Sequence, residues 1–193
     1  MLASAPMPAA PFQVDLLPYA GRLQRRDVGD IDLAVVHCTE LPDLATARAY
    51  AERVLYPDSG TGNSGHWYID RDGGTWQYLP HDRIAHHVRG HNPRSVGIEL
   101  VNTGRYPDWL DSRRQAMAEP YPEAQLDALL RLLQRLREEL PSLHWIAGHE
   151  DLDTEQVAAS DDPTLRVRRK RDPGPMFPWA RIQPACGLRR LLP

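Results

Sequence analysis

The stretch DLAVVHCT, residues 32–39, decides the fold that we expect of this chain. Its four consecutive apolar residues, Leu33 to Val36, are typical of a strand that is buried on both faces. His37 follows at the carboxyl end of that strand, which is where open α/β sheets place their functional side chains. The alternative interpretation is a histidine that is simply hydrogen-bonded inside the core.

Two further apolar runs carry a polar residue at or near their carboxyl ends. SVGIELVN, residues 95–102, holds Glu99 on the strand face opposite its apolar residues, and WIAGH ends at His149. A carboxylate in so apolar a strand either pairs with a cation or does chemistry with a raised pKa. Two histidines and an acid from separate strand ends could also hold zinc, which takes three protein ligands at catalytic sites. The chain has no H-E-x-x-H and no C-x-x-C motif, so spacing leaves these alternatives open.

The rest of the pattern predicts a single α/β domain. A helix is expected to begin at Pro42–Asp43 and to reach Leu55, and a leucine stripe predicts a longer helix between Pro122 and Pro141. The runs 66–70 and 75–79 flank Asp-Gly-Gly and indicate a hairpin. Alternating strands and helices favour a central sheet that is covered on both faces.

Less regular stretches surround this core. Residues 1–23 are expected to form a loose N-terminal arm ahead of a domain that spans 24–193. The segment 103–121 is expected to be an irregular insert, and regular structure is expected to run out after Glu150. The acidic and basic runs between 161 and 171 are interpreted as a solvated loop.

Composition narrows the class of protein. The 193 residues carry a net charge of −3, with 41% hydrophobic and 25% charged residues, as in soluble globular proteins that do not bind nucleic acid. No apolar run is long enough to span a membrane, and the N-terminus lacks the features of a signal peptide. Two distant cysteines exclude a disulfide framework. We therefore expect a cytoplasmic monomer.

Five segments together resemble one family. AVVHCT, SGHWYIDRDGGTWQYLP, SVGIELVN, IAGHEDL and RKRDPGPMFPW occur in the order seen in zinc-dependent N-acetylmuramoyl-L-alanine amidases. This family includes bacterial cell-wall-recycling amidases, phage amidase lysozymes and peptidoglycan recognition proteins, and the chain looks most similar to the recycling branch. The resemblance covers about residues 31–182. It implies a mixed sheet with helices on both faces and a shallow groove that bears zinc.

The resemblance also implies an activity and a set of site residues. The activity is hydrolysis of the amide bond between N-acetylmuramic acid, or its 1,6-anhydro form, and L-alanine of the peptidoglycan stem peptide. The family's zinc ligands, general base, catalytic lysine and groove histidines correspond here, in that order, to His37, His149 and Asp172, to Glu99, to Lys170, and to His66 and His87.

Two alternatives share the same implied fold. One is a non-catalytic peptidoglycan-binding module, which typically has lost a zinc ligand, whereas this chain keeps all three. The other is a zinc hydrolase that acts on a different amide. The insert 103–121 and the long segment 150–171 depart from the family pattern without removing a catalytic residue.

Overall fold

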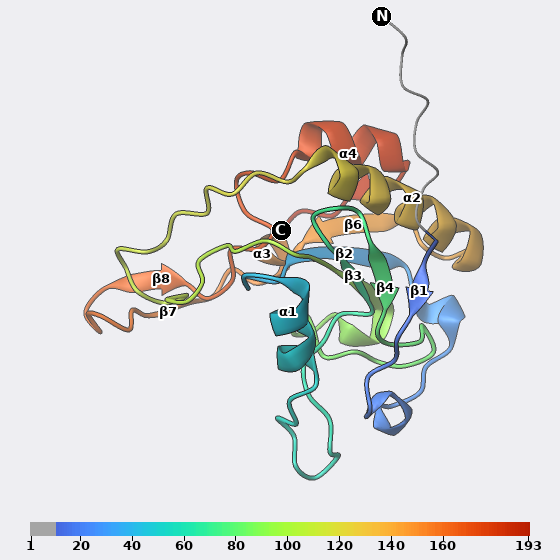
Figure 1. The fold of residues 1–193 in the computed structure, drawn as a ribbon, viewed down its shortest axis with the longest axis horizontal. Helices are drawn as coiled ribbons and strands as arrows, with labels where there is room; N and C mark the ends of the chain where they lie inside the picture. The colour runs from blue at the N-terminus through green and yellow to red at the C-terminus, as the bar shows by residue number, and fades with distance from the viewer. Residues whose placement is uncertain (1–10) are drawn as a thin grey trace, which may run out of the picture.

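The fold is built around a seven-stranded sheet, and the computed structural model describes it for residues 11–193. The strand order is β1-β4-β3-β5-β2-β6-β9, with β2 (Leu33–Cys38) near the centre (Figure 1). β2 runs parallel to both β5 (Ser95–Leu100) and β6 (Trp145–Gly148). β3 (Trp67–Ile69) is antiparallel to β4 (Thr75–Gln77), so the sheet is mixed, as expected.

The remaining elements complete the sheet, its helical layers and one hairpin. They are β1 (Gln13–Val14), η1 (Ala20–Arg22), η2 (Val28–Asp30), α1 (Leu44–Ala51), η3 (Asn92–Arg94), α2 (Glu123–Glu139), α3 (His149–Leu152), β7 (Gln156–Ala158), β8 (Arg166–Arg168), α4 (Trp179–Cys186) and β9 (Arg189–Arg190). No helix among the described residues is long and apolar enough to cross a membrane.

Helices cover both faces of the sheet, which confirms the expected fold class. α2 and α4 lie on one face and α1 lies on the other (Figure 1). The leucine stripe of α2, with Leu129 and Leu133 fully buried, packs in one cluster with Val36 and Ile98 of the central strands. Burying each such side chain contributes roughly 1.5–3 kcal/mol to folding. The two packed layers therefore hold the central strands rigidly in register.

Local signals explain where α1 begins and ends. The carboxylate of Asp43 accepts a hydrogen bond of 2.7 Å from the backbone N–H of Thr46, as an N-cap residue does. The helix ends at Ala51, so Val54 and Leu55, which we expected inside it, lie beyond it with 52% and 53% of their surface exposed.

The prediction of a loose arm over residues 1–23 is wrong for the part that the structure describes. Residues 1–10 lie outside the described range, but β1 extends the sheet by pairing with β4. Leu17 and Tyr19 are each 2% exposed, and the Tyr19 hydroxyl donates a 2.6 Å hydrogen bond to the carbonyl of Ala51. A two-residue edge strand has no periodicity of its own, so sequence patterns miss it.

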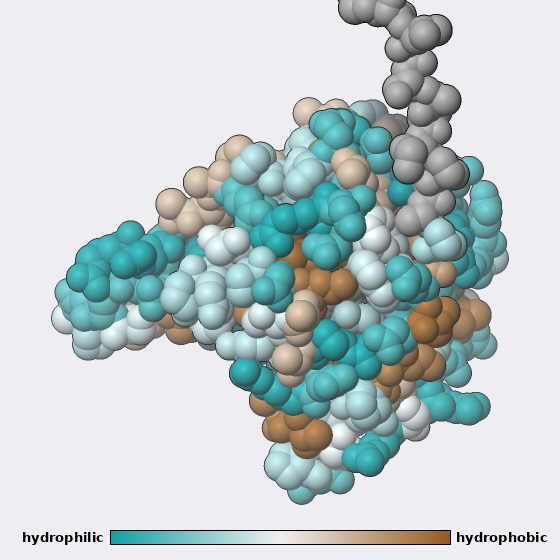
Figure 2. Space-filling model, viewed as in Figure 1, coloured by the Kyte–Doolittle hydropathy of each residue, from teal (hydrophilic) through white to brown (hydrophobic). Residues whose placement is uncertain are grey.

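The prediction that regular structure runs out after Glu150 is also wrong. α3 follows directly, the β7–β8 hairpin projects from the body of the domain, and α4 and β9 complete the fold (Figure 1). The tip of the projection is covered by hydrophilic residues, which fits the solvated interpretation of its charges (Figure 2). The insert 103–121 contacts the β7–β8 hairpin: Asp161, between the two strands, accepts a 2.6 Å hydrogen bond from the backbone N–H of Ser112.

Two neighbouring leucines test whether residues 11–23 belong to the core. Leu17→Ala should lower the free energy of unfolding by about 2–5 kcal/mol, because it leaves a cavity in the buried cluster that Leu17 shares with Tyr78 and Leu79. Leu16→Ala is the matched control, since Leu16 is 42% exposed and should change stability by less than about 0.5 kcal/mol. Urea unfolding followed by circular dichroism measures both. Equal, negligible effects would mean that this segment is a loose arm after all.

Candidate metal centre

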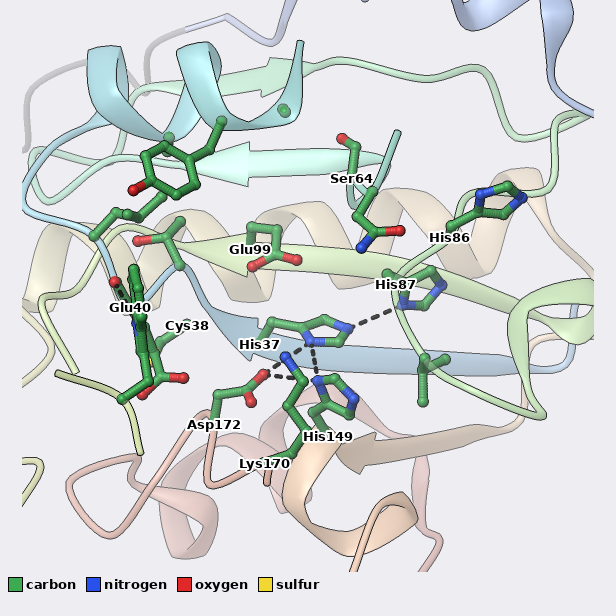
Figure 3. A pocket seen from close by; sticks show the side chains of 18 of the residues that line it. His37, Cys38, Glu40, Ser64, His86, His87, Glu99, His149, Lys170 and Asp172 are labelled. Atoms are coloured by element: carbon green, nitrogen blue, oxygen red, sulfur yellow. Dashed lines mark hydrogen bonds and ion pairs between the residues drawn. The ribbon is translucent and has the colours of Figure 1, made fainter. Parts of the chain in front are cut away.

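Three potential metal ligands meet at the carboxyl edge of the central strands. His37 lies near the end of β2, His149 directly follows β6, and Asp172 arrives on the loop before α4. The Nδ1 atoms of the two histidines are 3.0 Å apart, and Oδ2 of Asp172 is 2.9 Å from Nδ1 of His37 and 3.1 Å from Nδ1 of His149. All three residues are buried, and their side chains converge in Figure 3. The predicted ligand set is therefore one cluster.

The donor set of this cluster fits a metal ion. Each residue offers one ligand atom, and the three atoms lie within 4.8 Å of one another. The other carboxylate oxygen of Asp172, Oδ1, is buried and has no hydrogen-bond partner among the described residues. Two imidazole nitrogens and one carboxylate oxygen are a combination that zinc accepts, with a fourth position left for water or substrate.

The protonation states of His37 and Asp172 also favour metal binding. Burial lowers the pKa of His37 to about 4, so its imidazole is neutral at physiological pH and retains a lone pair. Burial alone would raise the pKa of Asp172, but the neighbouring His149 and the positive charge of Lys170 outweigh it and hold that pKa well below its usual value. An ionised carboxylate and a neutral imidazole are the forms that bind metal.

Glu99 faces this cluster from the adjacent strand. In the parallel pairing of β2 with β5, Glu99 is the register partner of His37, so both side chains leave the same face of the sheet (Figure 3). Burial raises the pKa of Glu99 well above its usual value, and the nearby charge of Asp172 raises it further. Gly65 makes room for it, because a Cβ there would lie 2.8 Å from Cγ of Glu99.

Lys170 differs from the arginines that precede it. Its side chain points into the same hollow as Asp172 and His37 (Figure 3). Arg168 donates a 2.5 Å hydrogen bond to the carbonyl of Glu150, and Arg169 forms ion pairs with two acidic residues. No ion pair or hydrogen bond joins the Lys170 side chain to another described residue. The basic run is thus not a set of interchangeable surface charges.

The two predicted groove histidines have different positions. His87 lines the groove, which has a volume of about 720 Å³, and its Nδ1 lies 2.9 Å from Nε2 of His37. His66 is fully buried and is not a groove residue. Its Nδ1 accepts a 3.0 Å hydrogen bond from the backbone N–H of Gly97, and its Nε2 lies 3.0 Å from the carbonyl oxygen of Arg83. The predicted substrate contact of His66 is therefore wrong, because its buried ring links Gly97 of β5 to the loop that contains Arg83.

A buried ion pair between Arg105 and Glu40 lies next to the site, and no sequence pattern predicted it. Nε of Arg105 donates to Oε1 of Glu40 at 2.7 Å, and its terminal nitrogens donate to the carbonyl oxygens of Arg168 at 2.9 Å and Arg169 at 3.3 Å. The guanidinium thereby fixes the backbone that leads into Lys170. Arg105 sits in the irregular insert, 65 positions from Glu40, so no local pattern connects the two residues.

Fold and site together define a class: an α/β protein in which three buried side chains that could bind a metal meet at a groove, as in metal-dependent hydrolases. A family model described as N-acetylmuramoyl-L-alanine amidase matches residues 27–175, and the chain belongs to that family.

Individual relatives agree with this assignment. The chain is 32% identical over 115 residues to the N-acetylmuramoyl-L-alanine amidase AmiD of Escherichia coli K12, a match that covers 55% of this chain and 36% of AmiD. It is 33% identical over 123 residues to the 1,6-anhydro-N-acetylmuramyl-L-alanine amidase AmpD of Enterobacter cloacae, covering 59% and 52% of the two chains. The chain thus spans about half or less of these relatives. The solved amidase LysC of Clostridium intestinale shares the fold, with a TM-score of 0.65, 19% identity and coverage of 93% and 99%.

Removing one partner of the buried pair tests its role. Arg105→Met should lower the free energy of unfolding by about 3–5 kcal/mol, because it leaves the Glu40 carboxylate buried without a counter-charge. Arg105→Met combined with Glu40→Gln should lose less than Arg105→Met alone, since the stranded charge is gone. Urea unfolding of the single and double variants measures this coupling. Strictly additive losses would show that the two side chains act independently.

Proposed function

We propose that this protein hydrolyses the amide bond between N-acetylmuramic acid and L-alanine of peptidoglycan stem peptides. The observation that carries the proposal is the buried group of His37, His149 and Asp172, with Glu99 and Lys170 in the same groove. A family member that served only to bind peptidoglycan would have no need of the complete ligand set. The reaction adds water across the C–N bond and yields a lactyl carboxylate and a free α-amino group on alanine.

We propose that the metal is zinc, held by Nδ1 of His37, Nδ1 of His149 and a carboxylate oxygen of Asp172. When bound, zinc would supply a Lewis acid and lower the pKa of a coordinated water to about 7. The three side chains are already buried and mutually within hydrogen-bond distance, so little reorganisation would be needed for binding.

Glu99 has the properties of a general base and acid. Its pKa is raised by burial and by the Asp172 charge, and a carboxyl poised in this way can take a proton from water and return it to the departing amine. Lys170 points into the same groove as the proposed zinc ligands, and we propose that its ammonium stabilises the negative charge that develops on the attacked carbonyl oxygen. A preorganised cation at that place stabilises the transition state more than the ground state.

We propose soluble anhydro-muropeptides as the preferred substrates. The support is the similarity to AmpD, which is named for the 1,6-anhydro-N-acetylmuramyl-L-alanine bond, together with a groove of moderate size. Arg53 at the groove wall supplies positive charge for the carboxylates of a stem peptide.

Product analysis tests the function and the metal together. The chain purified without a metal-affinity tag should contain one zinc per molecule by elemental analysis and should release stem peptide with N-terminal alanine from a purified anhydro-muropeptide, as detected by mass spectrometry. Treatment with a chelator should abolish turnover, and added zinc should restore it. A metal-free preparation with full activity, or a zinc-loaded one that leaves every muropeptide intact, would refute the proposal.

Glu99→Gln tests the base. The substitution keeps the shape of the side chain and removes its proton-accepting carboxylate, so turnover should fall by about 10²-fold or more while zinc content stays at one per chain. Glu138→Gln, on the exposed face of α2, is the control and should behave as the unmodified protein. Unchanged turnover in Glu99→Gln would reduce Glu99 to a structural carboxylate.

Lys170→Met tests the oxyanion contact. Loss of one positioned donor should lower turnover by about 10²–10³-fold with zinc content unchanged. Arg166→Met, on the exposed hairpin strand, removes a charge from the same basic run outside the groove and should have a small effect. If both variants lost turnover equally, and if added salt removed the difference from the unmodified protein, the effect would instead be one of diffuse charge.

A further inference from the structure

A chain of hydrogen bonds runs from the metal cluster back into the protein through two residues that the proposed chemistry does not use. Nε2 of His37 lies 2.9 Å from Nδ1 of His87, and Nε2 of His87 lies 3.1 Å from the hydroxyl oxygen of Ser95. That hydroxyl lies 2.8 Å from the carbonyl oxygen of His91, to which it donates. We call Ser95, His87 and His37 the relay. Figure 3 shows the contact of His37 with His87.

The last contact sets the direction of all the others. A serine hydroxyl carries one hydrogen, and the His91 carbonyl can only accept, so the hydrogen of Ser95 points to His91. The Ser95 oxygen therefore accepts from Nε2–H of His87. A neutral imidazole carries one N–H, so Nδ1 of His87 is left as an acceptor and receives the Nε2–H of His37.

This direction leaves Nδ1 of His37 without a hydrogen. That is the atom which faces Nδ1 of His149 and Oδ2 of Asp172. In the reverse direction His87 would donate to His37, and the hydrogen of His37 would occupy Nδ1, the position where a metal needs a lone pair. We propose that Ser95 and His87 are positioning residues that fix the His37 tautomer in its metal-binding form. This inference rests on the proposed zinc site.

The backbone around His87 is shaped for this contact. A Cβ on Gly97 would lie 2.7 Å from Nδ1 of the His87 ring, so only glycine at that strand position lets the ring approach β2. The side-chain oxygen of Asn92 accepts hydrogen bonds from the backbone N–H groups of His87 (3.0 Å) and Val88 (2.7 Å). The His87 ring is thus fixed by the hydrogen bonds to its backbone, by its contact with Ser95 and by its packing against Gly97. A side chain that only contacted substrate would not need so many supports.

Zinc affinity of the full-length chain tests the relay without any substrate. Partners that orient a metal-bound histidine typically contribute 10–100-fold to metal affinity. Ser95→Ala and His87→Phe should therefore weaken zinc binding by about that factor, measured by competition with a chelating indicator at fixed pH. His87→Gln should recover most of the loss, because its amide oxygen can accept from Nε2–H of His37. His86→Phe, the neighbouring groove histidine, is the control and should bind zinc as the unmodified chain does.

Side-chain NMR gives a second readout that a purely structural role would not move. Long-range ¹H–¹⁵N spectra should show His87 with its hydrogen on Nε2 in the unmodified chain, and a changed tautomer balance in Ser95→Ala. Urea unfolding of the zinc-free variants identifies any variant that fails to fold. If the variants do not fold, the His87 tautomer in the spectrum of the unmodified chain tests the relay. Unchanged zinc affinity in folded Ser95→Ala and His87→Phe, or a hydrogen on Nδ1 of His87, would overturn the relay.

Failure of the relay and failure of the proposed function are separable. Zinc binding and the His87 tautomer are measured without muropeptide, so a chain that passes both tests yet cleaves no muropeptide refutes only the activity. Conversely, if the protein is an active amidase and its zinc affinity does not change in the Ser95 and His87 variants, only the relay is refuted.

Discussion

The parallel pairing of β2 with β5 and β6 is the constraint on which the rest of the molecule depends. It places Glu99 opposite His37 and brings His149 alongside, so three chemically useful side chains share one edge without any loop having to position them. The leucine face of α2 and the buried strands stabilise this pairing from one side, and α1 covers the other. A shift of one residue in register would turn Glu99 to the opposite face. Core packing and site geometry are therefore a single property of this sheet.

The features predictable from sequence were those with a local pattern or a specific motif. The apolar run before His37, the leucine stripe and the Asp-Gly-Gly hairpin each gave the correct element, and motif resemblance selected Asp172, which no periodicity marks. Local patterns failed where elements are held by distant contacts. β1 and β9 are two-residue edge strands, and α4 contains Pro184, so none carries a helix or strand signature of its own.

Polar residues were harder to assign than apolar ones, because their partners are remote in sequence. His66 and His87 looked equivalent as groove histidines, yet His66 links β5 to the loop at Arg83 and His87 supports His37. Arg105 lies in the irregular insert, where no pattern marks it, and it is buried against Glu40. Burial of a charge demands a partner, but which partner is a property of the folded chain.

The two ends of the sheet have a consequence for the protein's behaviour at high concentration. An exposed strand edge offers unpaired N–H and C=O groups to another chain, and long flat edges promote aggregation. Here each outer strand, β1 and β9, is only two residues long, and β9 consists of two arginines. The sheet thus ends in edges too short, and on one side too charged, to template a strand from a second copy. At high protein concentration, this fold should therefore have little tendency to aggregate by pairing the sheet edges of two copies.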